Sequence, residues 1–313
     1  MLNEYQVDMR GMHSPQESLA ADHVIPFGKK SRTRTIAVKK QPLALRLLDI
    51  VGASVGLLLS LPLILVAMAM IWLQDRHNPF YVAERIGAGG RKFRFIKLRS
   101  IPHRSGVRPD EIITSRDPRV TRLGHWIRAS KVDELPQFWH VLRGEMSLVG
   151  PRANVQTIVD AFTEEELRII SVKPGITDLA SIVFMNLGKV LEASENPKLD
   201  YNQLVRPWKS RLALIYVDNQ SVGLALRIIM LTVVAFFNHQ RALEGVARIA
   251  MRYKSDPKLA RIVRREEQLT PCAPPGATAV VVEVPQSAAA AVAVTAANSG
   301  AANSVATEVS ATA

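Results

Sequence analysis

The chain has 313 residues, 48% of them hydrophobic, and its 40 Lys and Arg outnumber its 28 Asp and Glu, for a net charge of +12. This length suffices for one or two domains with a substantial core, and the positive charge favours a negative partner such as anionic lipid or a phosphorylated substrate. Aromatic residues make up only 6% and do not alternate with basic ones, which argues against a base-stacking nucleic-acid binder. The single cysteine, Cys272, excludes an internal disulfide and a cysteine-based zinc site.

A membrane-inserted segment is predicted over residues 42–75, after a flexible basic arm over residues 1–41. Residues 50–73 carry no charge, and as a straight helix they would reach about 36 Å, enough to cross a hydrocarbon core of about 30 Å. Pro62 lies at the middle of this run with Ser60 just before it, and a proline there kinks a helix. Two topologies are therefore possible: a kinked single span, and a re-entrant hairpin that returns to the same face.

The flanks of this segment favour the re-entrant topology. Seven Lys and Arg lie within residues 29–46 and seven more within residues 76–99. Because positive charge marks the cytoplasmic side of a membrane segment, both ends are predicted on that side.

A β-hairpin is predicted over residues 78–98, where apolar and polar residues alternate on both sides of four small residues, Gly87 to Gly90. The glycines form no phosphate-binding motif. Lys97 and Arg99 on the second strand are typical of a solvated face.

Residues 130–152, SKVDELPQFWHVLRGEMSLVGPR, hold a carboxylate pair, Asp133 and Glu134, between Arg128 and Arg152. Pro136 is typical of a first helical turn, so the pair is expected at a helix N-terminus, where the dipole favours an ionised carboxylate and phosphate. Such a cluster suits chemistry on a phosphorylated substrate with a divalent metal. A capped surface helix with ordinary charges explains the pattern equally well.

The C-terminal part is predicted to be helical and then disordered. A catalytic region over residues 76–220 includes a helix near 163–170 capped by Thr163 and another over 198–219. Apolar and basic helices cover residues 221–268: an interfacial or core-packed helix over 221–237, and a basic helix over 241–267 that lies on lipid headgroups. Residues 269–313 have the composition of a disordered low-complexity tail. The predicted fold class is α+β, mostly α-helical, with a re-entrant membrane helix, a small β-hairpin and amphipathic interfacial helices.

The ordered run of these segments resembles a known family. A membrane segment with a central proline is followed by PFYVAERIGAGGRKFRFIKLRS, DPRVTRLGHWIRASKVDELPQFWHVLRGEMSLVGPR and VKPGITDLASI. Over about residues 42–235 the chain is similar to the short form of the bacterial sugar transferases, the monotopic phosphoglycosyl transferases.

The resemblance implies transfer of a sugar-1-phosphate from a UDP-sugar to a polyprenyl phosphate such as undecaprenyl phosphate, with release of UMP, at the start of exopolysaccharide, O-antigen or related glycan synthesis. It assigns Asp133 as the nucleophile that carries a covalent phosphosugar. It also assigns Asp133 and Glu134 as ligands of a Mg²⁺ ion, with Glu134 as the main ligand. It assigns Arg128, Arg152 and Lys97 as the residues that bind the substrate phosphates. It also implies that the protein lies in the bacterial inner membrane, with its catalytic region on the cytoplasmic face. The resemblance is compatible with a homo-oligomer.

The chain departs from the family pattern in places that bear on the choice of sugar. Ala153 follows the Gly-Pro-Arg, Asp178 stands where a glycine is common, and Leu61 directly precedes the proline of the membrane break. His103, His125 and His140 lack metal-ligand spacing and are predicted to be ordinary core or surface residues. A catalytically silent membrane-anchored scaffold for a glycan assembly complex is the alternative function, although such a chain would be expected to have lost a dyad carboxylate.

Overall fold

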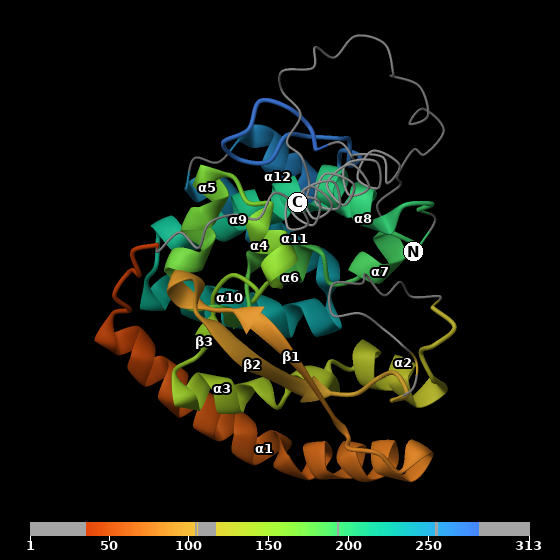
Figure 1. Ribbon diagram of the computed structural model, residues 1–313. Helices are drawn as coiled ribbons and strands as arrows, with labels where there is room; N and C mark the ends of the chain where they lie inside the picture. Colours follow the sequence, from red (N-terminus) through yellow and green to blue (C-terminus); the bar gives the residue numbers. More distant parts are fainter. Residues whose placement is uncertain (1–35, 104, 106–116, 193, 254–255, 282–313) are drawn as a thin grey trace, which may run out of the picture.

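The computed structural model describes residues 36–103, 105, 117–192, 194–253 and 256–281. These residues form a mostly helical body with two small sheets of two strands each, in agreement with the predicted α+β class. Figure 1 shows helix α1 (Leu43–Asp75) along the base, a β-hairpin above it and most other helices stacked over both. Most of the predicted basic arm lies outside the described residues, as do residues 104 and 106–116.

Helix α1 is one continuous helix of 33 residues that runs through Pro62. By length and composition it is the one described helix that could cross a membrane. Figure 1 shows it bent, as expected where a proline removes one backbone hydrogen bond. The segment therefore bends without a turn, and its re-entrant topology stays a prediction.

Both ends of α1 are fixed to the same body. Near its start, the guanidinium of Arg46 donates to the carbonyls of Val141 and Leu142, at 2.6 and 2.7 Å. At its end, Asp75 accepts two hydrogen bonds from Arg99, at 2.5 and 2.8 Å. Between these anchors most apolar side chains are exposed, and only 17% of the most apolar stretch is buried. The helix thus presents an apolar surface between two polar attachments.

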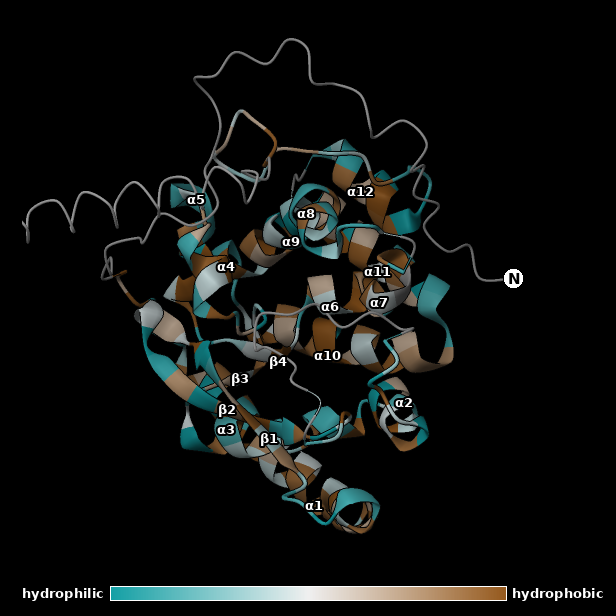
Figure 2. Ribbon diagram, turned by 45° about the vertical axis from the view of Figure 1, so that its right-hand side comes forward, coloured by the Kyte–Doolittle hydropathy of each residue, from teal (hydrophilic) through white to brown (hydrophobic). Residues whose placement is uncertain are grey.

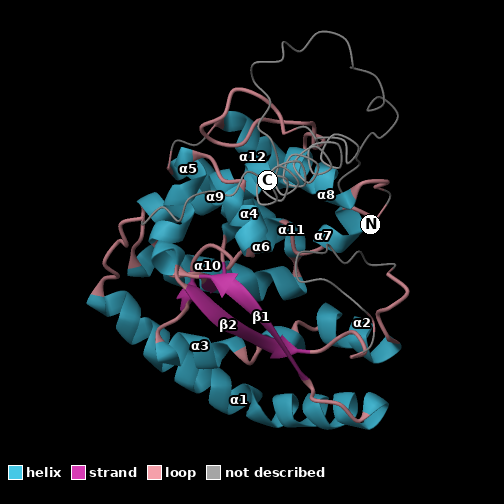
Figure 3. Ribbon diagram, in the orientation of Figure 1, coloured by secondary structure: helices cyan, strands magenta, loops and turns pink. Residues whose placement is uncertain are grey.

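The predicted hairpin is confirmed, with β1 (Phe80–Ile86) antiparallel to β2 (Lys92–Leu98) around the short turn η2 (Ala88–Gly90). Figure 3 shows these two strands crossing above α1. The second sheet is a parallel pair, β3 (Ser147–Val149) with β4 (Gly175–Thr177). The alternation of the hairpin sequence gives it one face that points into the body and one that faces outward.

The helices above the hairpin share one hydrophobic core centred on α9 (Arg206–Asp218), where Trp208, Leu212 and Tyr216 are each 1% exposed or less. Residues 221–268, predicted as a separate stretch, contribute to this same core. The remaining described helices and turns, in chain order, are α2 (Arg122–Ala129), η3 (Val132–Glu134), α3 (Gln137–Arg143), α4 (Gln156–Asp160), α5 (Glu164–Leu167), η4 (Arg168–Ser171), α6 (Leu179–Val183), α7 (Leu187–Val190), α8 (Pro197–Asp200), η5 (Tyr201–Val205), α9 (Arg206–Asp218), α10 (Val222–Phe237), α11 (His239–Arg252) and α12 (Pro257–Arg264).

Helix α10 is both core-packed and partly exposed, which combines the two alternatives, interfacial and core-packed, that its sequence left open. Leu224 and Ile228 are buried in the core, whereas Met230 and Phe237 are 68% and 88% exposed. Figure 2 colours this helix largely as hydrophobic. It therefore packs on the body with one face and leaves an apolar face exposed.

The prediction of a single basic helix over residues 241–267 is wrong. Two helices, α11 and α12, occupy this region, and Pro257 begins the second after an Asp256 cap. Both pack apolar faces into the core, and Figures 1 and 2 place α12 at the end of the molecule opposite α1. A lipid surface that receives α1 would therefore not reach α12.

The first part of the predicted disordered tail is packed against the body. Leu269 and Val281 are each 3% exposed, and the Cys272 amide donates to the Gln203 carbonyl at 3.1 Å. Gln203 also donates through Nε2 to the Val281 carbonyl at 2.7 Å. The prediction of disorder is wrong for residues 269–281, and residues 282–313 lie outside the described ranges.

Candidate active site

The carboxylate pair lies on a single turn of 3-10 helix, η3, between α2 and α3. Lys131 enters this turn in the left-handed conformation, with φ of 58°, and α3 begins only after Pro136. The pair therefore precedes the N-terminus of α3, close to its expected place, but it lies in a separate 3-10 turn and not in the α-helix itself. Val132, 3% exposed, packs in a cluster with residues of α1 and β2, which fixes the turn against α1.

Asp133 is buried, at 7% exposure, and its Oδ1 atom has no hydrogen-bond partner. Burial, with the negative charge of Glu134, raises the pKa of Asp133 to about 6, although Lys97, Lys131 and Arg152 oppose the shift. The helix dipole was expected to favour an ionised carboxylate at neutral pH; burial raises the pKa against that effect without neutralising the group. At pH 7 about nine tenths of such a group is still ionised.

Glu134 is held by Arg152 through both of its oxygens. Arg152 Nη1 donates to Oε2 at 2.9 Å and Nη2 donates to Oε1, a bidentate pair. Burial alone would raise the pKa of Glu134, but the charge and hydrogen bonds of Arg152 hold it below its usual value. The same pairing with Glu134 raises the pKa of Arg152 above its usual range.

The position of Arg152 follows from the parallel strand pair. Val149 lies in register with Thr177, and the Gly150 amide donates to the Thr177 carbonyl at 3.0 Å. A Cβ atom on Gly175 would lie 2.0 Å from the Gly150 nitrogen, so glycine is required where the two chains touch. Pro151 follows this contact, and the next residue, Arg152, places its side chain beside the dyad.

The hairpin and α2 supply the other predicted cations. Burial lowers the pKa of Lys97, with Asp133 and Glu134 opposing it, and burial lowers the pKa of Arg128, again opposed by Asp133. Lys97 lies on the inward face of β2, opposite Tyr81, with its ammonium 5.1 Å from the Tyr81 ring centre. The structure thus gathers Asp133, Glu134, Lys97, Arg128 and Arg152 in one place. The solvated face expected for Lys97 and Arg99 is not formed, and Arg99 is 7% exposed and pairs with Asp75.

Arg85 is a further cation of this site that sequence reasoning missed. Its Nε atom is buried without a hydrogen-bond partner, and burial together with the charge of Arg152 lowers its pKa. It stands over the Phe95 ring at 5.8 Å. The strand alternation contained the signal, because Arg85 and Lys97 fall on the same hairpin face when β1 and β2 are paired.

Ser60 and Pro62, predicted as the membrane break, do not join the charged cluster. Ser60 Oγ donates within its own helix, to the Leu57 carbonyl at 3.3 Å, and Pro62 is exposed. They shape α1 rather than contribute groups to the dyad.

His140 is a structural residue, as predicted. It is 2% exposed, its Nε2 accepts from the Ile96 amide at 3.1 Å, and its Nδ1 lies 2.6 Å from Glu145 Oε2. These bonds tie α3 to β2. Ser147 Oγ donates to Asp49 at 2.8 Å, so a triad of Ser147, His140 and Asp133 is not assembled.

A Mg²⁺ ion fits the dyad in its donor chemistry. The described residues contain no cluster of three or more His, Cys, Asp or Glu, but Mg²⁺ commonly binds one or two carboxylates and completes its shell with substrate phosphates and water. The unpartnered Oδ1 of Asp133 is a free anionic ligand of this kind. Glu134 already accepts from Arg152 through both oxygens, so Asp133 offers the more available atom.

Comparison with known proteins agrees with this geometry. A sequence model of the family described as "Bacterial sugar transferase" matches residues 40–239. A putative undecaprenyl-phosphate N-acetylgalactosaminyl 1-phosphate transferase of Bacillus subtilis is 36% identical over 152 residues, or 49% of this chain and 81% of that protein. A UDP-glucose:undecaprenyl-phosphate glucose-1-phosphate transferase of Caulobacter vibrioides is 34% identical over 194 residues, or 60% of this chain and 67% of that protein.

Longer relatives match over a smaller share of their length. A UDP-galactose-lipid carrier transferase of Erwinia amylovora is 37% identical over 149 residues, which is 43% of this chain but only 31% of that protein. The chain therefore spans about a third of this relative. Since the family match runs through the bent helix, the hairpin, the dyad turn and the Arg152 loop alike, the chain belongs to the bacterial sugar transferase family.

Proposed function

We propose that the protein transfers a sugar-1-phosphate from a UDP-sugar to a polyprenyl phosphate and releases UMP, as the first membrane step of exopolysaccharide or related glycan synthesis. The observation that carries this proposal is the buried, unpartnered carboxylate oxygen of Asp133 within a ring of cations. The relatives' names, which specify undecaprenyl phosphate together with UDP-glucose or N-acetylgalactosamine, support this substrate class.

In the first proposed step, an Asp133 oxygen attacks the β-phosphorus of the donor. A bond forms between that oxygen and phosphorus, and the bond to the oxygen that bridges the two phosphates breaks. UMP leaves with the bonding electron pair, and Asp133 carries the phosphosugar. A carboxylate with a pKa near 6 is largely ionised at neutral pH, so it requires no base to activate it.

In the second step, a phosphate oxygen of the polyprenyl phosphate attacks the same phosphorus. The Asp133–phosphorus bond breaks, the carboxylate is regenerated, and the product is a polyprenyl diphosphate sugar. Each step brings two anions together, and Lys97, Arg128 and Arg152 offset their repulsion.

Mg²⁺, when bound by Asp133 and Glu134 with the donor, would neutralise charge on the diphosphate. The residues themselves position the reactants. Arg152 holds Glu134 beside Asp133, and Lys97 and Arg128 approach from the hairpin and from α2. Arg85 adds a further cation next to Arg152.

We further propose that α1 is a re-entrant membrane helix and that the body lies on the cytoplasmic face of a bacterial inner membrane. The support is its two attachments to one body, through Arg46 and through Asp75, with an exposed apolar stretch between them. A helix that crossed the bilayer would place one of these attachments on the far side. The exposed apolar face of α10 would extend the same contact with lipid.

The test is UMP release from a panel of UDP-sugars by the purified protein with polyprenyl phosphate and Mg²⁺ in detergent. The proposal expects release that Asp133→Ala or Glu134→Ala abolishes. No release with any UDP-sugar would instead favour the catalytically silent scaffold. Full activity in Asp133→Ala would rule out the covalent route.

A further inference from the structure

The buried polar atoms that lack a hydrogen-bond partner are concentrated at the dyad. In the described part of the chain seven buried side-chain atoms have no partner, and four of them belong to Arg85, Asp133 and Gln137. An unpartnered polar atom in a protein interior costs free energy, and such local violations are expected at functional sites. Both amide atoms of Gln137 are in this group, and the residue is 0% exposed. Gln137 is therefore a candidate for a role beyond the fold.

Gln137 stands one helical turn beyond Asp133. Leu135 and Pro136, which join η3 to α3, have φ of −57° and −59°, and both lie in the right-handed helical region. The two helical pieces thus form a nearly continuous path. Side chains four residues apart on such a path are neighbours, and a Gln–Asp hydrogen bond is one of the pairs that this spacing permits. The spacing brings the Gln137 amide within reach of the Asp133 carboxylate.

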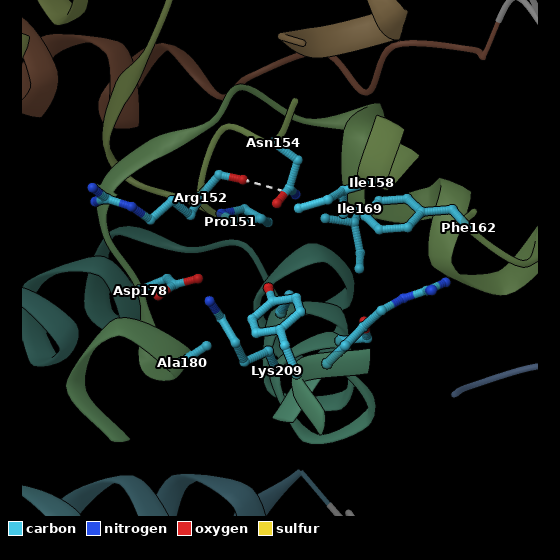
Figure 4. A pocket seen from close by; sticks show the side chains of 13 residues that line it. Pro151, Arg152, Asn154, Ile158, Phe162, Ile169, Asp178, Ala180 and Lys209 are labelled. Atoms are coloured by element: carbon cyan, nitrogen blue, oxygen red, sulfur yellow. Dashed lines mark hydrogen bonds between the residues drawn. The ribbon is translucent and has the colours of Figure 1, made fainter. Parts of the chain in front are cut away.

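The polar groups next to this pair already have partners. Gln137 shares the buried face of α3 with His140, whose ring nitrogens are both engaged. Arg152 donates to both oxygens of Glu134, and Figure 4 shows the Arg152 guanidinium pointing away from the other side chains drawn there. Among these groups, Oδ1 of Asp133 is the acceptor that remains for the Gln137 amide.

We propose that Gln137 is a positioning residue for Asp133, whose Oδ1 accepts a hydrogen bond from Gln137 Nε2 in the loaded site. The proposal rests on the proposed covalent role of Asp133. Hydrogen bonds of this kind are often open in a ligand-free site and form when substrate binds. Oδ1 is buried, so Oδ2 is the attacking atom, and the amide fixes the carboxylate plane that aims Oδ2 at the β-phosphorus. A carboxylate oxygen has two lone pairs, so Oδ1 can accept from the amide and still contact a metal ion.

The same hydrogen bond favours the second step of the reaction. In the first step Asp133 gives charge to the new oxygen–phosphorus bond, and Oδ1 becomes the carbonyl oxygen of an acyl phosphate. In the second step the bond between Oδ2 and phosphorus breaks, its electron pair returns to the carboxylate, and Oδ1 regains charge. An amide donates more strongly to a charged oxygen than to a neutral one. Gln137 therefore stabilises Asp133 as the leaving group, and its hydrogen stays on Nε2 throughout.

The test measures the two steps separately in the purified full-length protein in detergent with Mg²⁺. Rapid mixing with a UDP-sugar without acceptor gives the rate of UMP release, and mixing the resulting adduct with polyprenyl phosphate gives the rate of its discharge. In Gln137→Met, an apolar side chain of similar length, we expect release within about threefold of the wild-type rate, because lost aim and lost stabilisation of the starting carboxylate oppose each other. Discharge should be slower by about tenfold or more, so the adduct accumulates during turnover.

Thermal unfolding separates this role from a structural one. Gln137→Met removes two buried polar atoms that have no partner, so the variant should melt about 2 °C above the wild type or higher. A structural glutamine would instead give a variant that melts lower, with both steps slowed alike. Gln268→Met, the same change at an exposed glutamine, is the matched control and should leave both rates and the melting temperature unchanged.

Three results would overturn the assignment. Unchanged discharge in Gln137→Met would show that the amide takes no part in the reaction. A lower melting temperature with equal slowing of both steps would make Gln137 a structural residue. A raised KM for the UDP-sugar with normal rates at saturation would mean that the amide binds the donor and not Asp133. Each of these leaves the wild-type reaction intact, whereas a wild-type protein that forms no adduct and releases no UMP would contradict the proposed function and this assignment with it.

Discussion

Arg152 donates to both carboxylate oxygens of Glu134 through its terminal guanidinium nitrogens, while its own carbonyl accepts a hydrogen bond from Asn154 Nδ2. One residue thus holds the dyad through its side chain and the loop that follows through its backbone. The parallel contact between β3 and β4 fixes the place of Arg152, so this strand pair positions the partner of the dyad.

The bidentate pair predicts that Arg152→Lys is not a conservative change. A lysine keeps the charge but loses the fork that matches a carboxylate, so we expect kcat/KM for the UDP-sugar to fall about 10²-fold. Glu134→Gln should cost a comparable factor. In a double-mutant cycle the two losses should be clearly non-additive, because both changes break one interaction. Additive losses would show that the two side chains act independently.

The pKa of Asp133 predicts an acid limb in the pH profile. As the proposed nucleophile, Asp133 must be ionised, and its pKa is raised to about 6. We therefore expect kcat/KM to rise with pH up to about pH 7 and to fall about tenfold from there to pH 5. Because a bound cation favours the ionised form, the limb should move to lower pH as Mg²⁺ is raised. A profile that is flat between pH 5 and 7 at low Mg²⁺ would contradict a buried carboxylate nucleophile.

Sequence patterns predicted local structure better than they predicted burial. The hairpin and the Thr163 cap follow from alternation and capping, and both are present. The helix predicted over residues 198–219 is present as α8, the π-helical turn η5 and α9. The pKa of Asp133 and the role of Arg85 depend on what packs around them, which one-dimensional spacing does not specify. The ordered segment 269–281 was missed because its low-complexity composition conceals contacts with Gln203 and Thr163.

Asp49 links α1 to β3, the strand that precedes Arg152. Its Oδ1 accepts from Ser147 Oγ and from the Leu148 amide, both at 2.8 Å, and the carboxylate is 2% exposed. Asp49→Ala leaves two buried donors without an acceptor, so we expect a loss of about 2–4 kcal/mol in the free energy of unfolding. Chemical denaturation in mild detergent measures it.

The control for this variant is Glu84→Gln, which breaks an exposed pair with Lys92 and should cost less than about 1 kcal/mol. Equal stability of the two variants would mean that Asp49 does not anchor α1 to β3.

The two attachments of α1 predict that its flanks lie on one side of the membrane. Single cysteines at Lys40 and Arg91, introduced into a Cys272→Ser background, can be probed with a membrane-impermeant maleimide in intact spheroplasts and in lysed cells. We expect both to be labelled only after lysis. A cysteine at Leu59, in the exposed apolar stretch, should stay protected by lipid in both preparations. Labelling of one flank in intact spheroplasts would indicate a helix that spans the bilayer.

The most direct test of the central claim is intact-mass analysis of the protein after incubation with UDP-sugars and Mg²⁺ without the polyprenyl acceptor. We expect one equivalent of UMP and a mass increase of one phosphosugar on the wild-type protein, localised by peptide mapping to Asp133. Asp133→Asn should show neither, with a loss of turnover of about 10³-fold or more. UMP release that requires the acceptor and leaves no adduct on Asp133 would contradict the account.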